Sequence, residues 1–237
     1  MKHNYVNTSI QNDALLSLIT DSIQIITLDA NFIIPPDRSK ENSQVKAIPF
    51  EWFKTYWLKP LLYQFPYLAI HEAVQREIQT ELAKKFVADL VYGNPPLMIL
   101  LSDAVFTDFE EIFRKSVEAR IAYYTSYDPI IDNSKDRGEV KSLAHIATRG
   151  LLFFCSHDSQ AIRLIEQTEQ LNTQLDSVKA IRFYEIIYFL AKKKLGVNQA
   201  LRTLYKYIYH LTLSDKKCNP TWSEFLEKMD QQYLEAF

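Results

Sequence analysis

Three short apolar runs constrain the fold of this 237-residue chain more than any other feature of its sequence. Residues 23–29, 97–101 and 151–155 are rich in isoleucine, leucine and phenylalanine, and each is too short for a buried helix. Longer segments with a helical period separate the runs, and parallel strands need crossover connections of that length. We therefore predict an α/β fold, a three-layer sandwich with a central, mostly parallel sheet flanked by helices. The chain is predicted to be helix-rich and to end in a C-terminal helical extension.

The segments between the runs have the pattern of helices. The chain has only four glycines, and Pro35-Pro36 and the stretch 93–96 (Gly-Asn-Pro-Pro) interrupt regular structure. Residues 178–183 fit either a fourth strand or the start of the next helix. The predicted helices cover residues 50–62, 70–92, 103–124, 185–209 and 221–233, and another begins at Gly138.

Composition is that of a globular protein with one sizeable core, because 47% of the residues are hydrophobic. The formal net charge is only −2, so a polyanionic partner would have to meet a local basic surface. Two distant cysteines, Cys155 and Cys218, form neither a disulfide framework nor a zinc motif, which favours a reducing, cytoplasmic setting. The N-terminal residues do not resemble a signal peptide, and no apolar run reaches the roughly 18 to 20 residues of a membrane span. The sequence therefore predicts no membrane partner.

Aspartates lie at the ends of two of the predicted strands. Asp29 closes the first run, and Asp158 lies just beyond the third. An aspartate at a strand end is most often a helix N-cap or a turn former, so neither residue indicates a function by itself. Parallel pairing would nevertheless bring both carboxylates to the same edge of the sheet, where α/β proteins form their sites.

Three further acids fall in helical segments. Glu77 lies within the predicted helix 70–92, and Glu139 opens a helix after Asp136-Arg137-Gly138. Asp136 fits the N-cap of that helix better than a metal ligand, and we keep it as an alternate ligand. Taken singly, a helical glutamate is most often part of a solvated face.

The acids stand in four short motifs. Residues 26–32 are an apolar strand that ends in Asp and is followed by Asn31, and residues 74–78 place a valine before Glu77 on a helix. Residues 136–147 contain Gly-Glu at the start of a helix, and residues 151–158 are an apolar strand followed by Ser-His-Asp. In order and spacing these motifs resemble those of the PIN domain, a nuclease domain named from the N-terminus of a pilus-twitching protein.

The resemblance runs from about residue 24 to about residue 209, and the chain departs from it in three places. Asn31 stands where the family more often has Thr or Ser, and the segment 35–66 is long. Residues 222–237 lie outside the usual boundary. We therefore divide the chain into an N-terminal extension (1–22), a PIN-like domain with an elaborated 35–66 segment (23–210) and a C-terminal helical extension (211–237).

The resemblance implies a metal-dependent endoribonuclease, a hydrolase that cuts phosphodiester bonds with carboxylate-bound Mg²⁺ or Mn²⁺. Four carboxylates gathered in one place would repel one another and raise each other's pKa, so the grouping favours a cation. The implied catalytic acids are Asp29, Glu77, Glu139 and Asp158. The implied metal ligands are Asp29, Glu139 and Asp158, with Asp136 as the alternate, while Asn31 and Ser156 would orient waters or carboxylates.

The implied partner is an RNA substrate. Stand-alone PIN-like proteins are often toxins of toxin-antitoxin or defence modules, so an antitoxin protein is a second expected partner, and a homodimer is a third. Two other functions stay open. A haloacid-dehalogenase-like phosphatase would use Asp29, although Asn31 lacks the second carboxylate that chemistry needs, and a degenerate PIN scaffold would bind RNA or protein without cutting.

Several other residues could be assigned a function, but a structural interpretation of each is simpler. His157 beside Asp158 fits a strand-end residue better than a general base, and His71 and Glu72 fit an ordinary helix surface. Residues 192–209 interleave lysines and arginine with tyrosines, which suits nucleic acid. The preferred interpretation is a charged outer face with tyrosines packed inward. The aromatic segment 52–57 is either core or a partner groove.

Overall fold

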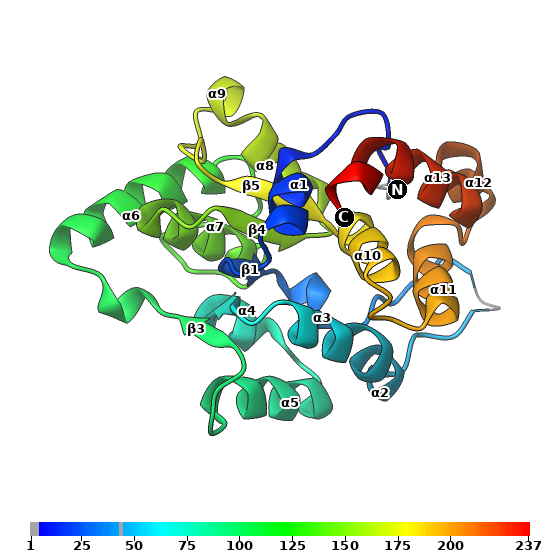
Figure 1. Ribbon diagram of the computed structural model, residues 1–237. Helices are drawn as coiled ribbons and strands as arrows, with labels where there is room; N and C mark the ends of the chain where they lie inside the picture. Colours follow the sequence, from blue (N-terminus) through cyan, green and yellow to red (C-terminus); the bar gives the residue numbers. More distant parts are fainter. Residues whose placement is uncertain (1–4, 43–44) are drawn as a thin grey trace. The chain divides into compact units, whose positions relative to one another are not determined.

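The computed structural model describes residues 5–42 and 45–237, which form two compact units (Figure 1). Unit 2 comprises Ile25–Ile34 and Pro66–Ala180, and unit 1 comprises the described residues before Ile25 together with Pro35–Phe65 and Ile181–Phe237. This division differs from the three ranges predicted from sequence, which remain a prediction. Residues 1–4 of the predicted N-terminal extension and 43–44 of the polar connector lie outside the described residues.

A parallel sheet organises unit 2. Its strand order is β3-β2-β1-β4-β5, and the pairs β2/β3, β1/β2 and β1/β4 are parallel. The predicted α/β class and parallel sheet are therefore confirmed, and the chain is rich in helices. The strands are β1 (Ile26–Leu28), β2 (Leu68–His71), β3 (Ile99–Leu101), β4 (Phe153–Ser156) and β5 (Lys179–Arg182).

The central strands are fully buried, as expected for strands with neighbours on both sides. All residues of β1, β2 and β4 are buried, which explains why these runs read as continuous apolar sequence and do not alternate. The fourth predicted strand is confirmed as β5. The register of β1 and β4 pairs Leu28 with Cys155, so both strands end at the same edge of the sheet.

The predicted helix over residues 70–92 is wrong. Its first residues belong to β2, and the remainder forms two helices, α4 and α5, with a break after Ile78. The reason is tertiary: the sequence Leu-Ala-Ile-His is short and apolar, and it pairs with strands on both sides. His71 then ends the strand and caps α4, because its ring accepts a hydrogen bond from the amide of Ala73.

Helices of unit 2 enclose an apolar core around β4. The buried cluster includes Val117, Leu143, Phe154 and Leu164, which come from three helices and the strand. Helix α7 contacts both α6 and β2. The helices are η1 (Ala30–Phe32), α4 (Glu72–Glu77), α5 (Glu81–Tyr92), η3 (Asp103–Val105), α6 (Asp108–Ala122), α7 (Arg137–Arg149), α8 (Ser159–Glu166) and α9 (Thr168–Leu171).

Aromatic side chains dominate the core of unit 1. Trp57 stacks on Phe183 with ring centroids 4.1 Å apart, and Tyr205 stacks on Phe225 at 4.6 Å. Trp57 is fully buried, so this part of the aromatic segment 52–57 is core. The helices are α1 (Asp13–Thr20), α2 (Phe50–Phe53), η2 (Lys54–Leu58), α3 (Lys59–Gln64), α10 (Phe183–Lys192), α11 (Asn198–Tyr209), α12 (Leu213–Cys218), α13 (Trp222–Tyr233) and η4 (Leu234–Ala236).

The structure also bears on the predicted helix 185–209 and on the absence of a predicted membrane span. The predicted helix 185–209 is interrupted, because α10 ends at Lys192 and α11 begins at Asn198, on either side of Gly196. Across the described ranges, no helix combines the length and the apolar character that a membrane crossing requires.

A buried ion pair ties the 35–65 segment of unit 1 to its C-terminal helices. The Arg38 guanidinium lies 2.9 Å from a carboxylate oxygen of Asp215, and it also donates to the carbonyl of Ile208 at 2.5 Å. Arg38 and Asp215 are 7% and 1% exposed. Removal of one partner of such a pair leaves an uncompensated charge away from water.

We expect Arg38→Ala to lower the free energy of unfolding by about 3 to 5 kcal/mol, measured by urea denaturation. The control is Lys84→Ala, which breaks an ion pair with Glu81 whose two side chains are 48% and 88% exposed. An exposed pair contributes about 0 to 1 kcal/mol, so this variant should unfold close to wild type. Equal losses in the two variants would contradict the role assigned to Arg38.

Candidate functional site

Asp29 lies at the carboxyl end of β1, buried and held by polar groups of β4 and η1. Its amide donates to the carbonyl of Cys155, which extends the β1/β4 ladder by one residue. One carboxylate oxygen accepts from the amide of Ala30 at 2.7 Å, and the other accepts from the Ser156 hydroxyl at 2.8 Å and the Asn31 amide at 2.5 Å. Asp29 is therefore the N-cap of η1 as well as the centre of a small polar cluster.

Ser156, Asn31 and Asp158 complete this cluster from the ends of β4 and β1. The Ser156 hydroxyl accepts hydrogen bonds from the Asn31 side chain at 3.2 Å and from the backbone amide of Asp158 at 3.0 Å. Asn31 in turn accepts from the backbone amide of His157. The structure brings Asp29, Asn31, Ser156 and Asp158 together at one edge of the sheet, and Asp158 also caps α8 through the amide of Gln160.

Glu77 stands close to this cluster from the end of α4. Its carboxylate accepts from the backbone amide of Gly138 at 2.7 Å, which joins the second and third sequence motifs. Gly138 is required by close approach: a Cβ on it would stand 2.7 Å from the Glu77 carboxylate. The glycine of the Gly-Glu motif thus makes room for the glutamate of the preceding motif.

Electrostatics link these carboxylates. Burial raises the pKa of Asp29 to about 6, hydrogen bonds from Ser156 and Ala30 oppose the rise, and the negative charges of Glu77 and Asp158 add to it. Burial also raises the pKa of Glu77, against the hydrogen bond from Gly138 and the charge of Arg137. Burial is thus the main cause of the raised pKa of Asp29, and Glu77 and Asp158 lie near enough for their negative charges to add to it.

Glu139 and Asp136 flank Gly138 at the start of α7. Glu139 is half-buried in the first turn of the helix. Asp136 occupies the N-cap position with a left-handed backbone (φ 57°), and its side chain makes no capping hydrogen bond. Asp136 thus holds the expected N-cap position without the capping hydrogen bond, because its carboxylate instead accepts from the amide of Ser126 in the preceding loop. Its charge contributes to the raised pKa of Glu77.

Asp29, Glu77 and Asp158 lie near one another, and Glu139 follows Gly138, whose amide binds Glu77, but the acids do not form a closed ligand cage. Over residues 5–42 and 45–237, the one set of three His, Cys, Asp or Glu side chains with ligand atoms all within 4.8 Å of one another is His71, Asp103 and His145. Asp29, Glu77, Glu139 and Asp158 do not meet that criterion. Their donor chemistry, all carboxylate oxygen, still suits a hard divalent cation.

The His71, Asp103 and His145 cluster is a feature that sequence reasoning missed. His71 is 1% exposed at the end of β2, so its expected place on a helix surface is wrong. His145 is 2% exposed on the inner face of α7. Its position between the buried residues Ala144 and Ile146 was the available signal, since a histidine on an apolar helix face needs a partner.

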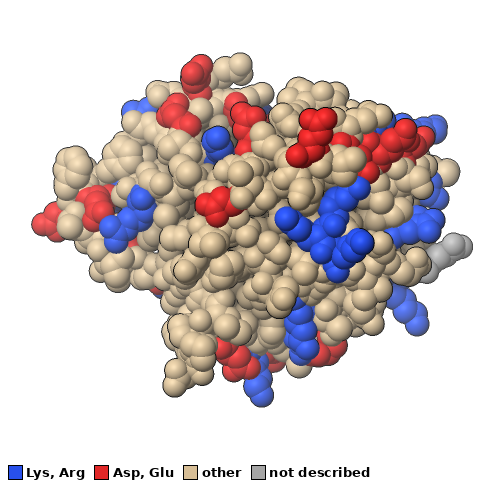
Figure 2. Space-filling model, in the orientation of Figure 1, with Lys and Arg blue, Asp and Glu red and all other residues tan. Residues whose placement is uncertain are grey.

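The tyrosines of α11 pack inward, as the simpler interpretation predicts. Tyr205, Tyr207 and Tyr209 are all buried. Figure 2 shows acidic and basic side chains mixed over the visible face, with a gathering of basic ones over the α10 region. Lys193, the C-cap residue of α10, lies over the rings of Phe189 and Phe237, at 5.9 and 5.3 Å from their centroids. These helices do not offer the stacking platform that the interleaved sequence suggested.

The raised pKa of Asp29 predicts that the stability of the protein depends on pH. Its pKa is higher in the folded protein (about 6) than the ordinary 3.8, so the native state holds this proton more tightly than the unfolded state. Stability associated with Asp29 is present at low pH and is lost as the pH rises from about 4 to about 6. In EDTA, the free energy of unfolding of wild type should fall relative to Asp29→Asn by about 3 kcal/mol over this window. If urea unfolding gave parallel pH profiles for wild type and Asp29→Asn, the raised pKa of Asp29 would be disproved.

The contact between Glu77 and Gly138 predicts a reversal of sign. Gly138→Ala should destabilise the wild-type protein, because the new methyl group displaces the Glu77 carboxylate. In a Glu77→Ala background the same change should stabilise by up to about 1 kcal/mol, which is the helix preference for alanine over glycine. A double-mutant cycle by chemical denaturation measures the coupling, and additive effects would rule out the contact.

Comparison with known proteins finds no relative of this chain: no family model matches it, and neither a curated protein nor a solved structure does. The four acids are therefore interpreted from their geometry and from the resemblance of their motifs to those of the PIN domain.

Proposed function

We propose that unit 2 is a PIN-like, divalent-metal-dependent endoribonuclease whose site is the carboxyl edge of β1 and β4. The observation that carries the proposal is the place of Asp29. It is a buried carboxylate at the end of a central strand, and it lies within the electrostatic reach of Glu77 and Asp158. Structural carboxylates are rarely left so close to like charges without a cation or a basic side chain to compensate.

Each residue has a definite task in this proposal. Asp29, Glu139 and Asp158 would hold Mg²⁺ or Mn²⁺, which supplies charge stabilisation for the phosphoryl oxygens and a nucleophilic water. Glu77 would orient a water, while its bond to Gly138 fixes the start of α7 and hence Glu139. Asp136 remains the alternate ligand at the same helix start.

Ser156 and Asn31 would act as positioning residues. Both side chains donate a hydrogen bond to the same carboxylate oxygen of Asp29, and the Ser156 hydroxyl also accepts one from the backbone amide of Asp158. This arrangement holds two proposed ligands at a fixed separation before any ion arrives. Partners of this kind commonly change metal affinity or activity by about 10- to 100-fold when removed.

RNA as the substrate, a role in a toxin-antitoxin or defence module, and a homodimeric state follow from the resemblance alone. The expected RNA substrate is the reason that the first assay uses RNA. A phosphatase on the haloacid-dehalogenase pattern is less well supported, because Asn31 donates to Asp29 and offers no second carboxylate.

The test is cleavage of a 5′-labelled single-stranded RNA by the purified full chain with MnCl₂ or MgCl₂. We expect cleavage that EDTA abolishes and that Asp29→Asn reduces to background, with Ser156→Ala lowering the rate by about 10- to 100-fold. The matched control is Asp176→Asn, which changes an exposed acid of the same unit and should cleave like wild type.

Three results would contradict the proposal. One is RNA binding that is unaffected by EDTA and is not followed by cleavage, as a degenerate scaffold would show. Another is hydrolysis of p-nitrophenyl phosphate with no cleavage of RNA, which would favour the phosphatase. A third is cleavage that survives Asp29→Asn, which would place the activity elsewhere.

A further inference from the structure

A second polar cluster of unit 2 centres on Asp103, in η3. One oxygen of its carboxylate faces both Nδ1 of His145 at 2.8 Å and Nε2 of His71 at 3.2 Å. The other oxygen lies 3.4 Å from Nε of Arg114. Burial would raise the pKa of Asp103, but the hydrogen bonds from both histidines and the charge of Arg114 hold it well below its usual range. Asp103 is thus an ionised acceptor, and the histidine nitrogens that face it carry protons.

The same geometry argues against a metal ion among these three side chains. His71 Nδ1 accepts from the amide of Ala73 at 3.2 Å, so its only proton is on Nε2. A cation bound to Nε2 would require a histidine with neither nitrogen protonated, or the loss of the cap on α4. Arg114 beside Asp103 adds a positive charge where a cation would bind. The cluster is therefore better described as a hydrogen-bonded network.

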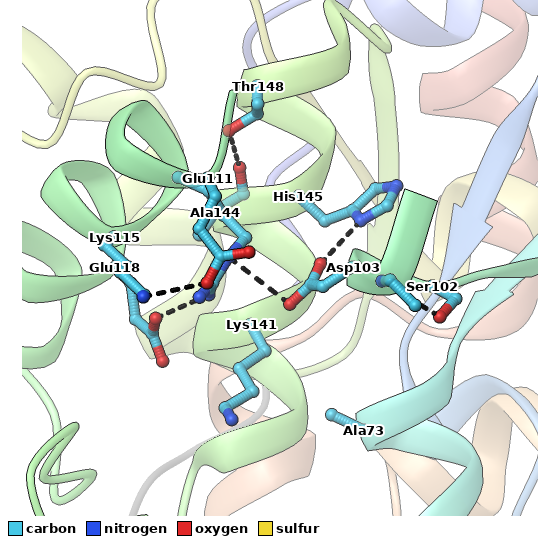
Figure 3. Close-up of polar contacts among 12 residues, drawn as sticks. Ala73, Ser102, Asp103, Glu111, Lys115, Glu118, Lys141, Ala144, His145 and Thr148 are labelled. Carbon is cyan, nitrogen blue, oxygen red and sulfur yellow. Dashed lines mark hydrogen bonds and ion pairs between the residues drawn. The ribbon is translucent and has the colours of Figure 1, made fainter. Parts of the chain in front are cut away.

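Both ring nitrogens of His71 have hydrogen-bond partners, whereas, in the part of the chain that the structure describes, only Nδ1 of His145 has one. In the neutral imidazole with its Nδ1 proton directed to Asp103, Nε2 carries a lone pair, and the ring turns this nitrogen away from Asp103 (Figure 3). Among the described residues, no side chain or backbone group donates a hydrogen bond to Nε2 of His145. The His145 side chain is 2% exposed, and Nε2 is its remaining hydrogen-bonding position.

His145 lines a pocket of about 270 Å³. Its polar members besides His145 are Ser102 and Arg149. The Ser102 hydroxyl is committed to Glu72 at 3.1 Å, and Arg149 reaches Glu110 at 2.7 Å while retaining other N–H donors. The apolar members of the lining are Ile25, Leu100, Leu101, Val105 and Leu151.

We propose that this pocket binds a small, largely apolar molecule with one hydroxyl donor, of the phenol class, whose O–H is accepted by Nε2 of His145. The apolar walls suit a single ring, and the volume is at the small end of ligand sites. The Arg149 guanidinium can donate to the oxygen of the same hydroxyl. Asp103 is a positioning residue here, because it fixes the tautomer and the direction of the His145 ring.

This site is separate from the proposed nuclease edge. Glu139 lies in the first turn of α7 and His145 lies six residues later, which is about 9 Å along the helix axis. The proposal therefore does not depend on the proposed function, and its readout is ligand binding with no assay of RNA cleavage.

Phenol and toluene are the two probes, because they share a ring and differ in the hydroxyl donor. Binding to the full chain is followed by NMR with histidine-selective ¹⁵N labelling, where a hydrogen bond accepted at Nε2 shifts that resonance. The His145 signal is assigned by its disappearance in His145→Phe. We expect saturable binding of phenol, about tenfold tighter than toluene, with a shift of the His145 Nε2 signal.

Pocket-filling variants keep the test decisive if His145→Phe fails to fold. Leu151→Phe should fill the pocket and weaken phenol binding at least tenfold, while Leu152→Phe, outside the pocket lining and 44% exposed, should bind like wild type. Equal affinity for phenol and toluene would overturn the proposal, and so would phenol binding unchanged by Leu151→Phe. Zinc chloride that shifts the signals of both His71 and His145, in a protein that does not bind phenol, would show a metal site instead.

Discussion

The parallel pairing of β1 with β4 is the constraint on which the rest of unit 2 depends. Its register sets Leu28 beside Cys155, and the ladder continues through the amide of Asp29. Asp29 directly follows β1 and Ser156 is the last residue of β4, with Asp158 two residues on. These residues share one edge because the strands run in the same direction. A one-residue slip would turn Asp29 to the other face and remove it from the Ser156 hydroxyl. The polar cluster is thus a consequence of backbone hydrogen bonding between two strands whose side chains are entirely apolar or small.

Two carboxylates of unit 2, Asp29 and Asp103, are shielded from water and compensated in opposite ways. Asp29 receives neutral donors, a hydroxyl and amides, and it faces other acids, so burial prevails and its pKa rises. Asp103 receives two imidazole protons and a guanidinium, so its pKa falls although it too is desolvated. A carboxylate surrounded by cationic and imidazole donors is already satisfied, whereas one surrounded by neutral donors and like charge gains from a cation. This contrast is why we place the proposed metal at the acidic edge and a neutral ligand beside the histidines, although the histidine cluster has the tighter geometry.

The features that a sequence reveals here are those encoded in short-range patterns. β1, β3 and β4 are predictable because their apolar runs are bounded by polar residues and breakers, and the acids at the ends of β1 and β4 follow from chain direction. β2 is not, since Leu-Ala-Ile-His continues into α4 without a breaker and only pairing with two neighbours makes it a strand. His71 was misplaced for the same reason, as a strand end and a helix surface look alike in sequence. The bond between Glu77 and Gly138 spans 61 positions, and no local pattern indicates it.

Helix α7 shows how such long-range contacts combine. Carboxylates from three other elements fix it along its length: Glu77 of α4 at the amide of Gly138, Asp103 of η3 at His145, and Glu110 of α6 at Arg149. Neighbouring residues of a helix differ by about 100° around its axis, so a rotation by one position would break all three contacts together. Apolar packing alone would tolerate such a rotation more readily, because Val140, Leu143 and Ala144 are interchangeable in kind. These three carboxylates therefore determine which face of α7 meets the sheet, and with it the direction in which Glu139 points.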